Sequence, residues 1–309
     1  MDISVIIPTY NPDISRLNLV LDCLRRQTLP LASWELIVVD NNSACSLSAL
    51  IDVSWHPYST VIREEKQGLT YARVSGFLAA KGSIIVLVDD DNLLEDRYLC
   101  NTLNVFTAEP GLGAAGGKIV PMFNGIPPGW LKQFYGNLAL RDFGETTIIN
   151  SWSSVYPATA PVGAGLALRS AALPRYIEKV STRQVLVQDR TGDSLSSGGD
   201  NDIVLELLKT GWTVGYFPAL CLTHIIPEER WQVDYLKRLI RETNKSWIRL
   251  LQSHQICPWK KISRWTVPLR MLKAWFTYKA WKSDANSINW QGACGTFEGL
   301  SVDSHKDDQ

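Results

Sequence analysis

Short apolar runs alternate with segments of helical spacing along the first third of the chain. The runs, rich in β-branched residues, lie at Ile3 to Pro8, Glu35 to Val39, Ser59 to Arg63 and Ser83 to Val88. Runs of this length predict buried parallel strands. Helical spacing predicts helices over Ser15 to Gln27 and over Thr70 to Ala80, the second closed by Gly82. This alternation predicts a doubly wound α/β sheet.

The pattern weakens in the middle of the chain and returns toward its end. Residues from about Gly111 to Arg190 are rich in glycine, proline and aromatic residues, and they predict loops around a pocket, apart from one strand at Gly165 to Arg169. The later segments predict a helix from Asp202 to Thr210 ended by Gly211, a strand from Thr213 to Phe217, and helices near Trp231 to Ser253 and Val267 to Lys282. The tail after Asn286 is polar and is expected to fray.

Composition narrows the class of protein. The 309 residues are 45% hydrophobic and 20% charged, which is typical of a globular chain. The six cysteines form no CxxC pair, so neither a zinc site nor a disulfide framework is indicated. The N-terminus does not match a secretory signal, and no apolar run reaches the roughly 18 residues that span a bilayer. We therefore expect a cytoplasmic protein.

Polar residues follow three of the predicted strands. They are Thr9-Tyr10-Asn11-Pro12, Asp40-Asn41-Asn42-Ser43 and Asp89-Asp90-Asp91-Asn92. In a doubly wound sheet, ligands bind beyond the carboxyl ends of the strands. The three segments are therefore expected to line one polar crevice.

The three consecutive aspartates are the strongest single candidate for chemistry. Carboxylate oxygens suit Mg²⁺ or Mn²⁺, and diphosphates need their charge neutralised. Alternate residues of an extended chain face the same way, so Asp89 and Asp91 could share one ligand while Asp90 points elsewhere. The competing interpretation is a solvated acidic turn that caps a helix starting near Leu94.

Two further residues fit a nucleotide site, each with a structural alternative. Asp40 can accept hydrogen bonds from a base or ribose, or it can form a turn with Asn41 and Asn42. Arg73 lies one turn into the helix that begins near Thr70, where it can reach a phosphate or base; otherwise it is an ordinary surface arginine.

A glycine loop with acids precedes the helix near Asp202. Its sequence is Ser196-Ser197-Gly198-Gly199-Asp200-Asn201-Asp202. An acid in such a loop can act as general base toward a substrate hydroxyl, or it can cap the helix. His224 could complete a metal site with Asp91, although a lone histidine is more often structural.

Taken in order, these segments resemble those of family 2 glycosyltransferases of the GT-A fold. Ser4 to Asn11 resembles the opening strand of that family, and Glu35 to Ser43 its second strand. Gly68 to Arg73 and Ile84 to Asp91 resemble its nucleotide-binding helix and its DxD strand. The likeness covers Ile3 to Arg230 and implies a GT-A (Rossmann-like), nucleotide-sugar-binding α/β domain with a mixed, mainly parallel sheet, followed here by a C-terminal helical extension.

The resemblance also suggests a division of the chain. Residues 1–230 would form the catalytic domain, with a nucleotide-binding half at about 1–110 and an acceptor-binding half at about 111–230. Residues 231–285 would form a basic, Trp-rich helical extension, and residues 286–309 a polar tail.

Roles on the donor side are implied residue by residue. The residues implied to bind the donor nucleotide are Pro8, Thr9, Asn11, Asp40, Arg73, Asp89 and Asp90. Among them, Asp40 would hold the base and Asp89 would contact the ribose. Asp91 would bind Mn²⁺ or Mg²⁺ on the diphosphate, with His224 as a further ligand.

On the acceptor side, Asp200 matches the catalytic base of the family. Gly199 stands where such enzymes have a glutamate, which puts any role of that glutamate in doubt here. Asp202 continues the motif, and Gly163 and Gly165 resemble a glycine strand that borders the acceptor site. The implied reaction is a single displacement with inversion, in which Asp200 deprotonates the acceptor hydroxyl.

The function implied is transfer from a nucleotide-diphosphate sugar, with UDP expected from family frequency, to a glycan or lipid-linked saccharide in surface or exopolysaccharide synthesis. One alternative is a non-catalytic carbohydrate- or nucleotide-binding scaffold, which the presence of Asp91 and Asp200 disfavours. The other is a sugar-phosphate nucleotidyltransferase, which would normally carry a glycine-rich loop after the first strand. Thr9 to Pro12 contain no glycine.

Basic and aromatic residues gather near the C-terminus. Lys237 to Lys282 hold twelve Lys or Arg residues and one acid, Glu242, within a chain of zero net charge. The tryptophans of this stretch are Trp247, Trp259, Trp265, Trp275 and Trp281. Such helices suit peripheral contact with an anionic membrane at its inner face, or they can pack on the catalytic domain. Nucleic-acid binding is not expected, because the rest of the chain is acidic and lacks a known module.

Overall fold

The computed structural model describes residues 1–182 and 198–302. Ser196 and Ser197 of the glycine loop lie outside these residues, and so does the end of the expected tail, 303–309. Contacts divide the described residues into two units. Unit 1 takes 1–122, 138–182 and 200–226, and unit 2 takes 123–137, 198–199 and 227–302.

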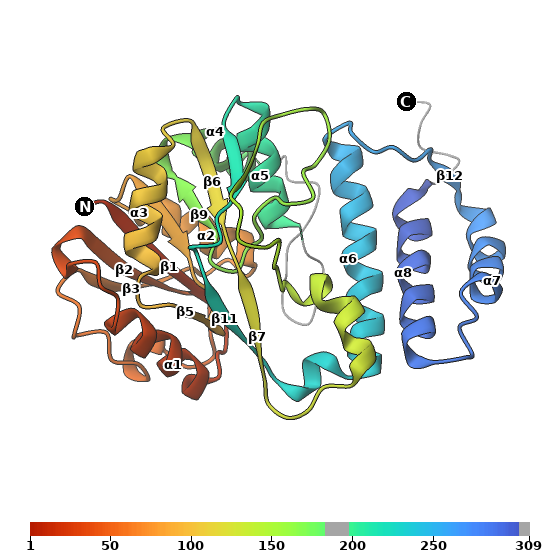
Figure 1. Ribbon diagram of the computed structural model, residues 1–309, viewed down its shortest axis with the longest axis horizontal. Coiled ribbons are helices and arrows are strands. Elements are labelled where there is room, and N and C mark those ends of the chain that lie inside the picture. The colour runs from red at the N-terminus through yellow and green to blue at the C-terminus, as the bar shows by residue number, and fades with distance from the viewer. Residues whose placement is uncertain (183–197, 303–309) are drawn as a thin grey trace. The chain divides into compact units, whose positions relative to one another are not determined.

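The first half of unit 1 confirms the predicted alternation. Its elements are β1 (Ile3–Thr9), α1 (Ile14–Arg25), β2 (Trp34–Asp40), β3 (Ser59–Arg63), α2 (Leu69–Ala79) and β4 (Ile84–Leu87). These four strands are parallel and lie in the order β3-β2-β1-β4, of which Figure 1 labels β1, β2 and β3. The expectation that all four are buried is wrong for β3, because it is the edge strand and is half-exposed.

The second half extends this sheet with mixed strand directions. The elements added are α3 (Tyr98–Ala108), β6 (Leu112–Gly116), β8 (Ile148–Asn150), β9 (Ala167–Arg169), α4 (Pro174–Ser181), α5 (Gly199–Lys209) and β10 (Thr213–Tyr216). The full order is β3-β2-β1-β4-β9-β6-β10-β8, with β9 antiparallel to both of its neighbours. A second, three-stranded sheet joins β5 (Asn92–Leu94), β11 (Leu222–Ile226) and β7 (Ile119–Phe123) in the order β5-β11-β7. The α/β fold with a mixed, mainly parallel sheet is thereby confirmed.

Helices cover both faces of the large sheet. On one face, side chains from β1, β2 and β4 pack with those of α2, α4 and α5 in one apolar cluster that includes Ile6, Phe77, Tyr176 and Leu207. All seven residues of β1 are buried, so its other side is covered as well, and Figure 1 shows α3 on that side of the sheet. The covered strands leave their polar carboxyl ends as the place for a ligand.

The middle of the chain corrects the expectation of loops. It holds β6, β7, β8 and α4, besides the strand expected near Gly165 to Arg169. The sequence of β6 is Leu-Gly-Ala-Ala-Gly, which lacks the β-branched residues that are typical of strands. Small residues are required there, because a Cβ at Gly113 would lie 2.6 Å from Trp212 Cβ, and one at Gly116 would lie 2.8 Å from Pro161 Cβ.

Unit 2 contains the C-terminal helices α6 (Val233–Ser253), α7 (Val267–Thr277) and α8 (Asp284–Leu300), with the short strand pair β12 (Ile262–Ser263) and β13 (Ser301–Val302).

The described residues of both units also contain 3₁₀ helices, at Leu31–Ser33, Leu47–Ala49, Gly129–Leu138, Ser170–Ala172, Glu228–Trp231 and Arg264–Thr266. No helix among the described residues is long and apolar enough to cross a membrane.

The frayed tail expected after Asn286 is wrong as far as Leu300, because these residues form most of α8. Glycines on α8 allow its backbone to approach α6 closely. A Cβ at Gly295 would lie 2.0 Å from the Arg241 carbonyl oxygen, and one at Gly299 would lie 2.7 Å from Ile248 Cβ. Glycine lowers helix propensity, so the sequence favoured fraying, whereas packing against α6 supplies the missing stability.

A buried histidine beside β2 makes the stability of unit 1 depend on pH. The His56 ring lies 4.1 Å from the Trp34 ring, and its Nδ1 accepts a hydrogen bond from the Tyr58 amide at 3.1 Å. Burial lowers the pKa of His56 from 6.5 to about 4, against the opposing charge of Glu35. The folded state therefore holds the neutral ring.

We expect this histidine to destabilise the protein in acid. Because the folded pKa lies below the unfolded value, its contribution is complete above pH 6.5 and is lost as the pH falls toward 4. The full loss is on the order of 3 kcal/mol. In His56→Asn, the side-chain oxygen accepts the Tyr58 bond and cannot be protonated, so the urea-unfolding free energy should vary less with pH in this range. Parallel pH curves for the two proteins would contradict the prediction.

Candidate active site

The carboxyl ends of β1, β2 and β4 bring the three predicted polar segments to one edge of the sheet. Thr9 pairs in register with Asp40, the last residue of β2, and Asp89 follows closely after β4. Pro8 is buried within β1 and holds the backbone before Thr9. Parallel pairing thus makes neighbours of residues that are far apart in sequence.

Backbone and side-chain hydrogen bonds join the loops after β1 and β2. Asn11 donates its amide to Ser43 Oγ at 2.9 Å, and its side-chain oxygen accepts from the Ala44 amide at the same distance. Asn41 Oδ1 accepts from the Gly68 amide at 2.8 Å, which fixes the start of α2. Asn41 was not singled out by the sequence analysis, because an asparagine after a strand is equally typical of any turn.

The carboxylate of Asp40 is buried and already has partners. One oxygen accepts from the Ser43 amide at 2.9 Å, and the other lies 3.2 Å from Arg63 Nη1. The turn-forming alternative for Asp40 therefore describes its contacts, and its role toward a base stays a prediction. Arg63, the last residue of β3, was missed because its alignment with Asp40 depends on strand pairing.

The three aspartates after β4 lie half-buried beside one another. Asp90 accepts a hydrogen bond from Thr9 Oγ1 at 2.5 Å, so this side chain points toward β1. Burial, followed by the charges of Asp91 and Asp89, raises the pKa of Asp90 to about 6, although the Thr9 bond opposes the shift. The site concentrates negative charge that a cation would relieve.

Asp91 lies against His224, as the sequence analysis expected of a shared site. The chain continues after Asp91 as β5, which pairs antiparallel with β11 and sets Asn92 opposite His224. His224 Nε2 is thereby 3.3 Å from Asp91 Oδ2, and both side chains are largely buried. The alternative of an acidic turn capping a helix near Leu94 is wrong, because Asn92–Leu94 is a strand and α3 begins at Tyr98.

Gly163 joins the two halves of unit 1 at the site. Its amide donates to Asp200 Oδ2 at 2.8 Å. A Cβ at this position would lie 2.9 Å from Arg73 Nη2 and 3.4 Å from Asp200 Oδ2. Arg73 is buried, so it is not the ordinary surface arginine of the alternative interpretation. Asp200 thus contacts the Gly163 amide, and a Cβ at position 163 would displace the Arg73 guanidinium while making an ordinary contact with the Asp200 carboxylate.

Gly165, and the pair formed by Tyr156 and Asn201, are close in sequence to Gly163 and Asp200. Gly165 has a φ of +67°, and a Cβ there would lie 2.4 Å from Leu222 Cδ2. Asn201 accepts a hydrogen bond from the buried Tyr156 hydroxyl at 2.6 Å. Tyr156 was missed by the sequence analysis, because a tyrosine in an irregular segment carries no positional signal.

Asp202 forms an ion pair with a lysine of α4. Its Oδ1 lies 2.5 Å from Lys179 Nζ on α4, and the carboxylate is buried. Lys179 also lies 2.9 Å from Glu206, one helical turn further along α5. This arrangement ties α5 to α4, and the acceptor-side role of Asp202 stays a prediction. Gly199 is the first residue of α5 and is buried.

Comparison with curated proteins finds partial matches. The chain is 27% identical over 120 residues to "Glycosyltransferase AglE" of Haloferax volcanii, which covers 38% of this chain and 39% of that protein. It is 29% identical over 147 residues to "Poly(ribitol-phosphate) beta-glucosyltransferase" of Bacillus spizizenii, which covers 46% of this chain and 23% of that protein. The chain thus matches well under half the length of these relatives.

Solved structures share the fold over nearly the whole chain. Staphylococcus aureus TarS 1-349 in complex with UDP-GlcNAc has a TM-score of 0.54 at 15% identity, covering 96% of this chain and 91% of that one. The mannosyltransferase PcManGT of Pyrobaculum calidifontis, in complex with GDP-Man and Mn²⁺, has a TM-score of 0.58 at 17% identity, covering 96% and 86%. At these identities the likeness shows the fold alone.

Family models match most of the chain. Residues 84–282 match the model "Glycosyl transferase family group 2". Residues 4–159 match the model "Glycosyl transferase family 2", a segment that contains β1 to β4 and the aspartates after β4. This match covers just over half of the chain, and it agrees with the GT-A fold and with the polar residues at the strand ends. The chain therefore belongs to glycosyl transferase family 2.

Proposed function

We propose that this glycosyltransferase moves a sugar, with inversion, from a UDP-sugar to a hydroxyl of a glycan or lipid-linked saccharide in surface or exopolysaccharide synthesis. The observation that carries the proposal is the Asp200 carboxylate bound by the Gly163 amide at 2.8 Å, beside Arg73 of the nucleotide-binding half. This contact supports a base at the boundary between a donor side and an acceptor side. The nucleotide sugars named for the solved relatives support the donor class.

The donor side is proposed at the carboxyl ends of β1, β2 and β4. Pro8, Thr9 and Asn11 would form the wall around the nucleoside, and Asp40 with its partner Arg63 would meet the base. Asp89 would accept hydrogen bonds from ribose hydroxyls. Residues at these strand ends are held by strand pairing rather than by the ligand, so they would bind without large rearrangement.

Asp91 and His224 are the proposed metal ligands. Burial, followed by the charges of Asp91 and Asp89, raises the pKa of Asp90 to about 6, and a cation beside these three adjacent carboxylates would favour their charged forms. Carboxylate oxygens with one imidazole nitrogen fit Mn²⁺, and the carboxylates alone fit Mg²⁺. When bound, such an ion would neutralise charge on the diphosphate leaving group. Arg73 would add a fixed positive charge on the same side.

Asp200 is the proposed general base. Its carboxylate would take the proton of the acceptor hydroxyl while that oxygen attacks the anomeric carbon from the side opposite the diphosphate. The new glycosidic bond forms as the bond to the diphosphate breaks, so the configuration inverts. The Gly163 amide would orient the carboxylate and keep one of its oxygens occupied, which leaves the other for the acceptor proton.

We propose that the segments around Gly163 and Gly165 determine which acceptor binds. We also propose that the basic C-terminal helices contact an anionic membrane at its inner face, which would bring the site close to lipid-linked acceptors.

Metal-dependent donor binding should require Asp91. Asp91→Asn keeps the size of the side chain and removes its charge, so we expect UDP affinity in the presence of Mn²⁺ to fall by roughly 100-fold, about 2.7 kcal/mol. Isothermal titration with UDP and GDP, with and without Mn²⁺, measures this change. Asp22→Asn, at an exposed position of α1, is the matched control and should bind as wild type. Wild-type affinity in Asp91→Asn would refute the ligand assignment.

Turnover should require Asp200 while donor binding should not. Asp200→Asn can still accept the Gly163 hydrogen bond through its side-chain oxygen but cannot take a proton. We expect kcat to fall by roughly 10²- to 10⁴-fold with little change in UDP affinity. The measurement is UDP release from UDP-sugars in the presence of saccharide acceptors.

The matched control for Asp200→Asn is Asp142→Asn, an exposed carboxylate of the same unit. It should leave kcat unchanged. If Asp200→Asn turned over at the wild-type rate, another residue would have to be the base.

A further inference from the structure

One side of α7 is packed and the opposite side is not. Val267 and Ala274 are buried, and the Met271 carbonyl accepts a hydrogen bond from Trp290 Nε1 of α8 at 3.0 Å. This side of α7 therefore belongs to the core of unit 2. At 100° per residue, Leu269, Leu272 and Phe276 lie on the opposite side of the helix, and all three are exposed.

The outer side of α7 carries a stripe of large apolar residues. The exposed fractions are 72% for Trp265, 64% for Leu269, 55% for Leu272 and 57% for Phe276. Their spacing of four, three and four residues places them in one line along the helix and its preceding turn. A stripe of this kind is unusual on a soluble surface and indicates a binding face. We call these four residues the α7 stripe.

The segment of the chain that carries the α7 stripe is basic. Residues 255–283 contain seven Lys or Arg residues and no Asp or Glu. All seven are exposed: Lys260, Lys261, Arg264, Arg270, Lys273, Lys279 and Lys282. Trp259 and Trp281, each about half exposed, lie before and after the helix. Aromatic side chains at the ends of a basic amphipathic helix suit the boundary between lipid headgroups and acyl chains.

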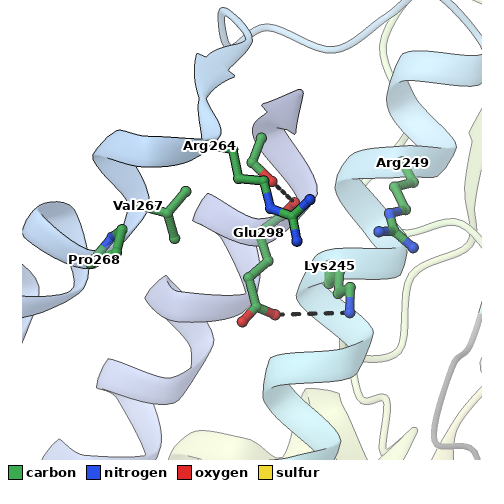
Figure 2. Close-up of a pocket in the computed structure, with 7 residues that line it drawn as sticks. Lys245, Arg249, Arg264, Val267, Pro268 and Glu298 are labelled. Carbon is green, nitrogen blue, oxygen red and sulfur yellow. Dashed lines mark hydrogen bonds and ion pairs between the residues drawn. The ribbon is translucent and has the colours of Figure 1, made fainter. Parts of the chain in front are cut away.

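A cationic pocket adjoins the start of α7. Figure 2 shows Lys245 and Arg249 from α6, Arg264 from the turn before α7, and Glu298 from α8 around it, with Val267 and Pro268 on its α7 side. Its volume is about 490 Å³.

The pocket keeps a surplus of positive charge. Its one carboxylate, Glu298, pairs with Arg241 and lies 3.9 Å from Lys245. No ion pair or hydrogen bond of Arg249 is present among residues 1–182 and 198–302, and its side chain is exposed. A phosphate group is the ligand that such a pocket fits best.

We infer that unit 2 binds an anionic phospholipid surface through α7. The α7 stripe enters the boundary between headgroups and acyl chains, the basic residues around it meet the anionic headgroups, and the pocket of Lys245, Arg249 and Arg264 takes a lipid phosphate. This inference deepens the membrane contact of the proposed function and rests on that contact, not on turnover. We assign the membrane contact to α7, because the facing sides of α6 and α8 pack against each other.

Charge complementarity favours a lipid surface over a second copy of the chain. Two copies joined through the α7 stripe would bring two basic, acid-free segments together, and like charges repel. An anionic bilayer supplies both the apolar layer and the opposite charge. Each basic residue near such a surface strengthens binding by about fivefold.

The test is co-sedimentation of the full chain with vesicles of phosphatidylcholine alone and of phosphatidylcholine with phosphatidylglycerol. We expect binding to the anionic vesicles, weakened by salt, and little binding to phosphatidylcholine. Leu269→Glu with Phe276→Glu should lower binding to the anionic vesicles at least tenfold. Both positions are exposed, so circular dichroism and thermal unfolding should match wild type.

Two matched controls test whether the effects are specific to the α7 stripe and to the pocket. Leu78→Glu places the same kind of change on α2, where Leu78 is 69% exposed, and should bind vesicles as wild type. Arg249→Gln with Arg264→Gln should weaken binding more than Arg97→Gln with Lys132→Gln, which removes the same charge from two other exposed positions.

Several results would overturn the inference. They are wild-type binding by the stripe variant, equal binding of wild type to both kinds of vesicle, no vesicle binding at all, or a dimer of wild type in light scattering that becomes a monomer in the stripe variant. Vesicle binding needs neither donor nor acceptor, so UDP titration of the same proteins shows separately whether the proposed donor site stands.

Discussion

The crowding of carboxylates at the end of β4 is the constraint on which the proposed donor site depends. Three aspartates lie half-buried together, and the pKa of Asp90 rises to about 6 because burial and its neighbours disfavour the charge. Two contacts in the fold offset the free-energy cost of placing these carboxylates together. Thr9 at the end of β1 donates a hydrogen bond to Asp90, and the pairing of β5 with β11 sets His224 against Asp91. The remaining negative charge is the feature on which we base the proposal of a cation and a diphosphate at this site.

The absence of a side chain at Gly163 fixes the geometry around the proposed general base. A Cβ there would lie 2.9 Å from Arg73 Nη2 and would displace this guanidinium. The amide of the same residue then holds the Asp200 carboxylate. Gly163 thereby contacts both Arg73 and Asp200, so the position of the proposed base is tied to that of the proposed nucleotide-binding arginine.

In unit 2, glycines allow two helices to pack closely. The glycines of α8 lie against the backbone of α6, and α7 packs on α8 through the side that carries Val267 and Ala274. An outer apolar side is left over on α7, in the most basic part of the chain. The same packing that stabilises the extension therefore creates the surface for which we infer a lipid partner.

The sequence by itself determined the strand and helix alternation of β1 to β4 and the polar strand ends, because a buried parallel strand must be a short apolar run whose polar residues lie at its end. It also predicted that His224 lies beside Asp91, as the structure shows, whereas the roles of Asp91, His224 and Asp200 stay predictions. Tertiary structure decided what periodicity cannot encode. β6 is a strand although it is built of glycine and alanine, since only small residues fit beneath Trp212. α8 is a helix although it contains glycines, since its stability comes from α6. Partners such as Arg63 for Asp40 are decided by strand register, which brings together residues that are distant along the chain.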